Sequence, residues 1–307
     1  CLIPIPAKVI IEDNCVYYLK RCRTHGVQKT LISDDSAYWQ SQKLWLKPGD
    51  RPLTVQTRTE AGCPFDCGLC PDHEQHSCLA IVEINAACNL SCPVCFASAQ
   101  DVHGAHLPLA TIEAMLDTLV ESEGEPDLLQ LSGGEPTLHP QFFEILDAVK
   151  NRPIRHVMIN TNGVRIAQEP DFVERLASYA PRLEVYLQFD SLCDDALMNL
   201  RGARLARIRQ QALQALERVG LSTTLVAVIK RGVNDGEIAD IITHALTWSC
   251  VRGVTFQPVQ DAGRNEGFDG KANRMVLSQI RREIAKAGVF GLEDLIPLPC
   301  NPDQICI

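Results

Sequence analysis

The chain has 307 residues and a mass of 33.9 kDa, with 46% hydrophobic and 22% charged residues, which is the composition of an ordinary globular protein. The formal net charge of −9 argues against a nucleic-acid-binding protein, because such proteins usually carry a basic stripe. No apolar run approaches the ~20 residues that a helix needs to cross a membrane. We therefore expect a folded protein with no nucleic-acid partner and no transmembrane segment.

Residues 1–60 form a separate β-rich segment with short extended runs and no helical period. The runs cover Ala7–Ile11, Val16–Leu19 and Lys29–Ile32. Cys1 and Cys22, the latter followed by His25, predict a truncated rubredoxin-like or zinc-ribbon-like segment that holds mononuclear iron or zinc. The sequence starts at Cys1 rather than at Met and shows no signal peptide, so we expect a fragment of a longer product.

Residues 61–79 form a loop rich in Cys, Pro and Gly, in which four cysteines follow the pattern C-x3-C-x2-C-x7-C. These are Cys63, Cys67, Cys70 and Cys78. Thiols clustered at such intervals indicate metal ligands rather than disulfides, and they require a reducing compartment such as the cytoplasm. Four thiolates can close an auxiliary [4Fe–4S] cluster completely, and a structural zinc site is the alternative.

Over residues 80–290, short β-rich runs alternate with amphipathic stretches, which is the pattern of βα units around a parallel sheet. The expected strands are Leu79–Ile84, Leu128–Leu131, His156–Asn160, Leu183–Phe189, Thr223–Ile229 and Gly253–Gln257. The expected helices cover residues 109–120, 142–149, 205–219, 235–247 and 273–287. Six units are too few for a closed eight-stranded barrel, so an open barrel or a doubly wound sheet remains.

Cys88, Cys92 and Cys95 follow the first of these strands in the pattern C-x3-C-x2-C. They stand at the carboxyl end of the strand, where α/β folds place their active sites. A [4Fe–4S] cluster normally takes four cysteines, so three cysteines leave one iron open to a ligand that the protein does not supply. The alternative interpretation of this motif is a zinc knuckle or an inert loop.

A second motif, Gly133-Gly134-Glu135-Pro136, follows the second expected strand. Its two glycines permit a ligand to approach the backbone closely, and Glu135 offers a carboxylate. Alone, this tetrapeptide most often means a turn. One βα unit after a loop with three cysteines, it becomes a much more specific indication of a cofactor site.

Together the two motifs resemble those of the radical S-adenosylmethionine (SAM) superfamily, over about residues 79–290. The resemblance implies an α/β fold with a partial (β/α)6 barrel and small N-terminal and C-terminal metal-binding extensions. It also implies that the open iron binds SAM, and that reductive cleavage of SAM gives a 5′-deoxyadenosyl radical that abstracts hydrogen from an unactivated C–H bond. The implied SAM-binding residues are Gly133, Gly134, Glu135 and Pro136 at the amino group, Gln188 and Asp190 at the ribose, and Asn160, Asn162 and Gln257 elsewhere.

The cysteine phrase across residues 62–97 is similar to that of a subgroup containing archaeal tetraether lipid synthase and class D radical methylases of pterins. This resemblance implies one or two auxiliary [4Fe–4S] clusters, the second beginning in residues 291–307 with Cys300 and Cys306 as ligands. It also implies an electron donor such as ferredoxin or flavodoxin.

From this resemblance, our first hypothesis for the reaction is C–C bond formation on a lipid alkyl chain. We expect the protein to be cytoplasmic or membrane-peripheral. The alternative reaction is transfer of a methyl or methylene unit to a pterin-like small heterocycle. An alternative of another class is a non-enzymatic iron–sulfur or zinc scaffold.

Overall fold

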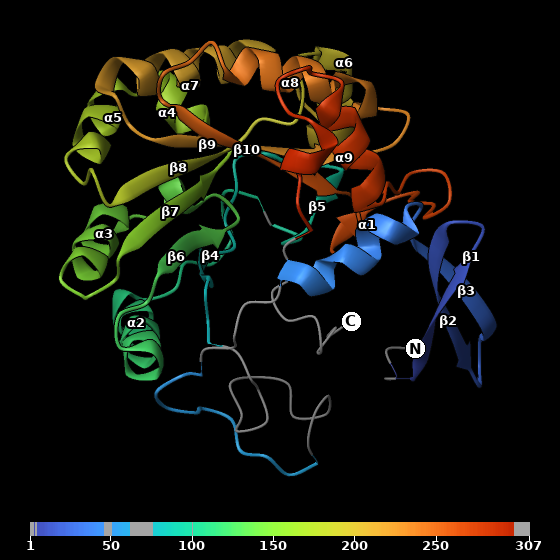
Figure 1. The fold of residues 1–307 in the computed structure, drawn as a ribbon. Helices are drawn as coiled ribbons and strands as arrows, with labels where there is room; N and C mark the ends of the chain where they lie inside the picture. The colour runs from blue at the N-terminus through green and yellow to red at the C-terminus, as the bar shows by residue number, and fades with distance from the viewer. Residues whose placement is uncertain (1–2, 4, 46–50, 62–75, 100, 298–307) are drawn as a thin grey trace. The chain divides into compact units, whose positions relative to one another are not determined.

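The structure, a computed structural model, describes residues 3, 5–45, 51–61, 76–99 and 101–297 (Figure 1). The chain divides into two compact units, each with its own secondary structure. The larger unit comprises Ser77–Arg274, and the smaller one comprises Cys1–His76 together with Met275–Ile307.

A six-stranded parallel sheet forms the centre of the larger unit. Its strands are β4 (Ala80–Asn85), β6 (Leu128–Gly133), β7 (His156–Thr161), β8 (Leu183–Gln188), β9 (Thr223–Ile229) and β10 (Val251–Pro258). They pair in the order β10-β9-β8-β7-β6-β4, so β4 and β10 are the two edges of an open sheet. All six expected strands are present within two residues of their expected ends, which confirms the predicted α/β class.

Helices connect these strands and lie along the outer side of the sheet (Figure 1). They are α2 (Leu109–Glu123), α3 (Phe142–Lys150), α4 (Val164–Gln168), α5 (Pro170–Ala177), α6 (Asp194–Arg201), α7 (Ala206–Val219) and α8 (Ile238–Ala245), with 3-10 helices at Pro136–Leu138 and Asp235–Glu237. The sequence pattern missed α4, α5 and α6. Each spans at most eight residues, which is too short for a clear apolar period.

The core of the larger unit lies between the outer face of the sheet and the helices. Residues on that face are buried and apolar, as in the alternation of Leu183, Val185 and Leu187 along β8. The intervening residues, Glu184, Tyr186 and Gln188, are polar and only partly buried. Because side chains alternate between the two faces of a strand, the inner face of the sheet carries these polar side chains, together with apolar ones such as Ile81 and Val228 on other strands.

The smaller unit contains a three-stranded antiparallel sheet, with the strand order β1-β2-β3. Its elements are β1 (Ala7–Glu12), β2 (Cys15–Cys22), β3 (Gly26–Ser33), α1 (Ser36–Ser41), α9 (Leu277–Ala285), and 3-10 helices at Gln42–Trp45 and Leu292–Asp294. The helix expected over 273–287 as the last of the barrel series belongs here instead. It is held at the end of β3, where the Ser278 hydroxyl and the Arg282 guanidinium both donate to Asp34.

Several expected metal ligands fall outside the described residues: Cys1, Cys63, Cys67, Cys70, Cys300 and Cys306. The auxiliary clusters assigned to them therefore stay predictions. Cys78 is described and is exposed. Within the described part of the chain, no helix combines the length and apolar character that crossing a membrane requires.

Asp34 provides a test of how α9 is attached. The pKa of Asp34 is lowered to about 2: burial opposes ionisation, but hydrogen bonds from Arg282 and Ser278 outweigh it. Because the folded-state pKa is depressed, this contribution to stability is present above the unfolded pKa of about 3.9 and is lost as the pH falls toward 2.

We expect Asp34→Asn to lower the free energy of unfolding at pH 7 by about 1–2 kcal/mol, the scale of hydrogen bonds to a charged group. The measurement is urea unfolding at pH 7 and at pH 2.5, where the difference from wild type should shrink. Asp261→Asn, at an exposed position, is the matched control. Equal stability of Asp34→Asn and wild type at pH 7 would contradict the assignment.

Candidate active site

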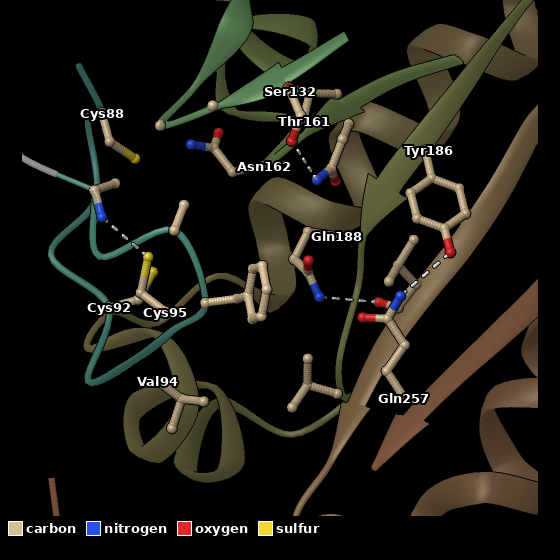
Figure 2. A pocket seen from close by; sticks show the side chains of 18 of the residues that line it. Cys88, Cys92, Val94, Cys95, Ser132, Thr161, Asn162, Tyr186, Gln188 and Gln257 are labelled. Atoms are coloured by element: carbon tan, nitrogen blue, oxygen red, sulfur yellow. Dashed lines mark hydrogen bonds between the residues drawn. The ribbon is translucent and has the colours of Figure 1, made fainter. Parts of the chain in front are cut away.

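A pocket of about 520 Å³ lies on the inner face of the parallel sheet, toward the carboxyl ends of its strands. Figure 2 shows polar side chains from neighbouring strands and the cysteines of one loop around the same space. The strand residues that line it include Glu83, Gln130, Ser132, Asn160, Tyr186, Gln188 and Gln257, and the loop supplies Cys88, Cys92 and Cys95.

The cysteine loop begins directly after β4 and carries all three expected cluster ligands. Cys88 and Cys92 are buried and Cys95 is partly buried. Backbone N–H groups of Leu90 and Ala99 donate to the Sγ atoms of Cys88 and Cys95, each at 3.4 Å. Burial raises the pKa of the Cys88 thiol to about 11, so the thiolate needs a bound metal to be stable at neutral pH.

Within the described residues, no group of three or more His, Cys, Asp or Glu side chains is arranged to hold one metal ion. The donor set is three thiols on one loop, which suits iron–sulfur chemistry.

The turn after β6 packs its backbone directly on the start of the cysteine loop. Gly134 N–H donates to the Asn85 carbonyl at 2.9 Å, and Glu135 N–H donates to the Ala87 carbonyl at 2.7 Å. A Cβ on Gly134 would stand 2.2 Å from the Ala87 carbonyl oxygen. The sequence suggested that the glycines admit a ligand; the structure shows that they also admit the cysteine loop itself.

The Glu135 carboxylate accepts hydrogen bonds from neighbouring residues and does not line the pocket. Its side chain is 1% exposed. One oxygen accepts from the Thr161 hydroxyl at 2.7 Å, and the other accepts from the Asn162 backbone N–H at 2.7 Å. Glu135 therefore ties the ends of β6 and β7 together, and the Asn162 side chain continues the connection to Asn89 in the cysteine loop.

Asp190, expected at the ribose of SAM, is instead fully buried in an ion pair with Arg201. The Arg201 Nε and Nη2 atoms donate to the two carboxylate oxygens at 2.7 and 2.6 Å. Burial opposes the charge of Asp190, but Arg201 outweighs it and holds the pKa of the carboxyl below its usual value. Arg201 also donates to the Val94 carbonyl at 3.0 Å, so this ion pair helps to hold the backbone of the cysteine loop in place.

A second arginine, Arg264, contacts the same loop although it lies about 170 residues further along the sequence. Strand β11 (Arg264–Asn265) pairs with β5 (Val94–Cys95) inside the loop. Arg264 donates to the carbonyls of Cys92 at 2.7 Å and Ala99 at 3.2 Å. Gly263 takes a φ of +64°, and a Cβ there would stand 2.3 Å from the Phe96 carbonyl oxygen. Nothing in the local sequence signalled this contact.

Arg209 lines the pocket although its side chain is only 1% exposed. One guanidinium nitrogen donates to the Asn162 carbonyl. Its Nε and Nη2 atoms are buried with no hydrogen-bond partner among the described residues. Because a buried unpaired donor is costly, Arg209 is suited to an anionic group bound in the pocket.

The structure thus divides the expected SAM-binding residues into two sets. Gly133, Gly134, Asn160, Asn162, Gln188 and Gln257 line the pocket, whereas Glu135, Pro136 and Asp190 lie outside its lining and are buried. The sequence pattern did not identify the arginines at 201, 209 and 264. It also missed Glu83, Gln130 and Tyr186, whose alternation along their strands was the available signal.

In the smaller unit, Cys22 lies at the end of β2 with its Sγ atom 3.4 Å from Nδ1 of His25. Backbone hydrogen bonding at His25 lowers the pKa of the Cys22 thiol to about 7, which favours the thiolate that binds metals. The turn between β2 and β3 therefore carries two side chains with metal-binding chemistry.

Family models match two parts of the chain. The model described as the radical SAM superfamily matches residues 82–245. The model described as the HMPTM N-terminal zinc ribbon domain matches residues 1–34, which supports the expected zinc-ribbon-like segment.

Among curated proteins, the 7,8-dihydro-6-hydroxymethylpterin dimethyltransferase of Methanocaldococcus jannaschii is 31% identical over 97% of this chain. The mycofactocin maturase MftC of Mycobacterium ulcerans is 27% identical over 56% of this chain. The chain spans 60% of the length of the first relative and 45% of the second.

Solved structures resemble the fold. A radical SAM methyltransferase from Sphaerobacter thermophilus matches 97% of this chain and 77% of its own, with a TM-score of 0.51 and 14% identity. Streptococcus suis SuiB matches 74% of this chain and 52% of its own, with a TM-score of 0.54 and 20% identity. At these identities the likeness concerns the fold alone.

The three loop cysteines can be tested directly. We expect Cys88→Ala, Cys92→Ala and Cys95→Ala each to abolish cleavage of SAM and to lower iron content, because each removes one cluster ligand, while the sheet still folds. The measurements are 5′-deoxyadenosine formation, bound iron and circular dichroism. Cys193→Ala, at an exposed cysteine, is the control. Cleavage at the wild-type rate by any loop variant would refute the ligand set.

The glycine turn is tested by Gly134→Ala. The added methyl group overlaps the Ala87 carbonyl, so we expect a loss of about 1–3 kcal/mol in the free energy of unfolding, as for other overpacked sites, and less bound iron. Gly236→Ala is the matched control, because nothing lies within 4 Å of its added Cβ. If Gly134→Ala kept wild-type stability and iron content, the close backbone contact would not be needed.

Proposed function

Since the chain belongs to the radical SAM superfamily, with which its own residues 82–245 match, we propose that it is a methyltransferase-type radical SAM enzyme acting on a pterin-like small heterocycle. Family membership makes it a radical SAM enzyme and implies a [4Fe–4S] cluster and SAM. The substrate and the group transferred are the proposal.

The residues present fit the implied cofactors. Cys88, Cys92 and Cys95 would hold the cluster, because they are three thiols on one loop with backbone N–H groups donating to two of the sulfurs. Arg209 would bind the carboxylate of SAM, because two of its buried nitrogens have no partner among the described residues. When bound, these cofactors supply one-electron cleavage of SAM and a radical that abstracts hydrogen.

The chain's own contribution is placement and exclusion of water. Arg201 and Arg264 fix the backbone carbonyls of the cysteine loop, and Glu135 fixes the strand ends next to it. Cys88, Cys92 and Val94 form a buried part of the lining on the cysteine side, and exclusion of water from reactive groups prevents side reactions. Gln188 and Gln257 line the wall opposite the cysteines (Figure 2).

The choice of substrate rests on the pterin-named relative and on hydrogen-bonding side chains of the sheet's inner face that stand among apolar lining residues such as Ile81 and Val228. Ser132 accepts a hydrogen bond from Asn160 at 3.3 Å, and Gln257 donates to the Tyr186 hydroxyl at 3.4 Å. An alkyl chain laid along this face would remove water from these groups and from Glu83 without offering hydrogen bonds, which is costly. A heterocycle with several donors and acceptors satisfies them.

The relatives do not support the lipid alkyl chain that the sequence pattern placed first. The relative that matches nearly the whole chain acts, by its name, on a hydroxymethylpterin. Because this chain spans 60% of that relative's length, the shared activity is a proposal for this protein. The zinc-ribbon match at residues 1–34 supports a zinc site at Cys22, and the auxiliary clusters and the electron donor remain predictions.

The assay uses anaerobically reconstituted protein with SAM and a one-electron reductant. We expect 7,8-dihydro-6-hydroxymethylpterin to raise 5′-deoxyadenosine formation severalfold, because a bound substrate supplies the hydrogen atom, and deuterium on the pterin to appear in 5′-deoxyadenosine. A long-chain diether lipid in detergent is the comparison substrate and should leave the rate unchanged.

If only the lipid raised 5′-deoxyadenosine formation, the result would contradict the pterin proposal and support C–C bond formation on an alkyl chain. Bound iron with no cleavage under any condition would favour the non-enzymatic scaffold.

A further inference from the structure

Two polar side chains in the pocket have no hydrogen-bond or ion-pair partner among the residues that the structure describes. Glu83 on β4 is exposed to the pocket, and no hydrogen bond or ion pair joins it to another described residue. Gln130 on β6 lines the same pocket with only 7% of its surface exposed, and its side-chain amide also lacks a partner within the described residues. The Gln130 amide is not among the fully buried polar atoms that lack a partner, so it remains accessible from the pocket and free to bind a ligand there.

The two side chains occupy neighbouring strands on the same face. In the parallel register, Glu83 is level with Ser132 and Gln130 is level with Ile81, so Gln130 lies one side-chain step deeper than Glu83. Asn160, on the next strand, donates to Ser132. Strands are about 4.8 Å apart, so the three strands present this set across about 10 Å, the scale of a bicyclic ring.

The hydrogen-bonding capacities of the pair form a pattern. A carboxylate only accepts, through two oxygens, whereas a glutamine amide can donate through its nitrogen. A ring edge with a carbonyl, a ring N–H and an exocyclic amine offers one acceptor followed by two donors. Two parallel N–H bonds to one carboxylate are strong and geometrically specific.

We infer that Glu83 and Gln130 select a substrate with a 2-amino-4-oxopyrimidine edge, the edge that a pterin presents. Glu83 accepts from the ring N–H and the 2-amino group, and Gln130 donates to the 4-oxo group. This assignment rests on the proposed function and adds to it the part of the ring that the protein reads. β4 runs from Glu83 into the cysteine loop, so a ring held at this edge stays close to the cluster ligands.

The test compares the affinities of two ligands for the reconstituted protein. One is 7,8-dihydro-6-hydroxymethylpterin, and the other is the matching lumazine, which carries oxygen in place of the 2-amino group. We expect wild type to prefer the pterin by tenfold to a hundredfold (about the effect of a hydrogen bond to a charged group), measured by anaerobic fluorescence titration. In Glu83→Gln that preference should fall severalfold, because an amide at this position can donate to the lumazine oxygen.

Gln130→Leu is a second variant with a different expected signature. Both ligands carry the 4-oxo group, so their affinities should fall together while the preference for the pterin remains. Glu121→Gln, on the exposed side of α2, should bind both ligands as wild type does. Cluster absorbance should be unchanged in Glu83→Gln, since no hydrogen bond or ion pair joins Glu83 to a described residue of the cysteine loop.

The outcomes separate this inference from the proposed function. If wild type binds the pterin and Glu83→Gln keeps the full preference, the role of Glu83 is overturned and the proposed function stands. If Gln130→Leu leaves both affinities unchanged, the role of Gln130 is overturned. If wild type cleaves SAM but binds neither ligand, the proposed function fails and takes the inference with it.

Discussion

The rest of the site depends on one backbone contact, between the glycine turn after β6 and the loop after β4. Gly134 and Glu135 donate to carbonyls immediately before Cys88, and no side chain fits between the two segments. The carboxyl ends of neighbouring parallel strands lie at the same edge of a sheet. Pairing of β4 with β6 therefore brings the glycine turn and the cysteine loop together. This contact fixes the first cysteine relative to the sheet, and the remaining loop can then be held by side chains.

Arginines provide that second level of support. Arg201, neutralised by Asp190, reaches the Val94 carbonyl, and Arg264 reaches the carbonyls of Cys92 and Ala99. A guanidinium presents several donors in a rigid plane, so one side chain can fix more than one peptide group. Burial raises the pKa of the Cys92 thiol, and the positive charge of Arg201 beside it offsets part of that effect.

The two faces of the parallel sheet have different tasks. The outer face is apolar and packs against the helices, and its burial stabilises the larger unit. The inner face carries Glu83, Gln130, Ser132, Asn160, Tyr186 and Gln257, which would be a poor core but forms a recognition surface. These side chains give the pocket, whose lining also includes apolar residues such as Ile81 and Val228, the hydrogen-bonding groups that a small heterocycle can use.

The sequence by itself determined the cysteine motif, the glycine turn, the six strands and hence the family, because each of these is a local pattern of spacing or alternation. It could not reveal that Asp190 belongs to a buried ion pair, that α9 packs beside β3, or that Arg264 supports Cys92, since these contacts join residues far apart in the chain. The cysteine phrase likewise left lipid and pterin chemistry open, with the lipid first. Only the tertiary structure brought the polar residues of separate strands to one concave surface, because which side chains share a surface depends on the pairing and register of the strands.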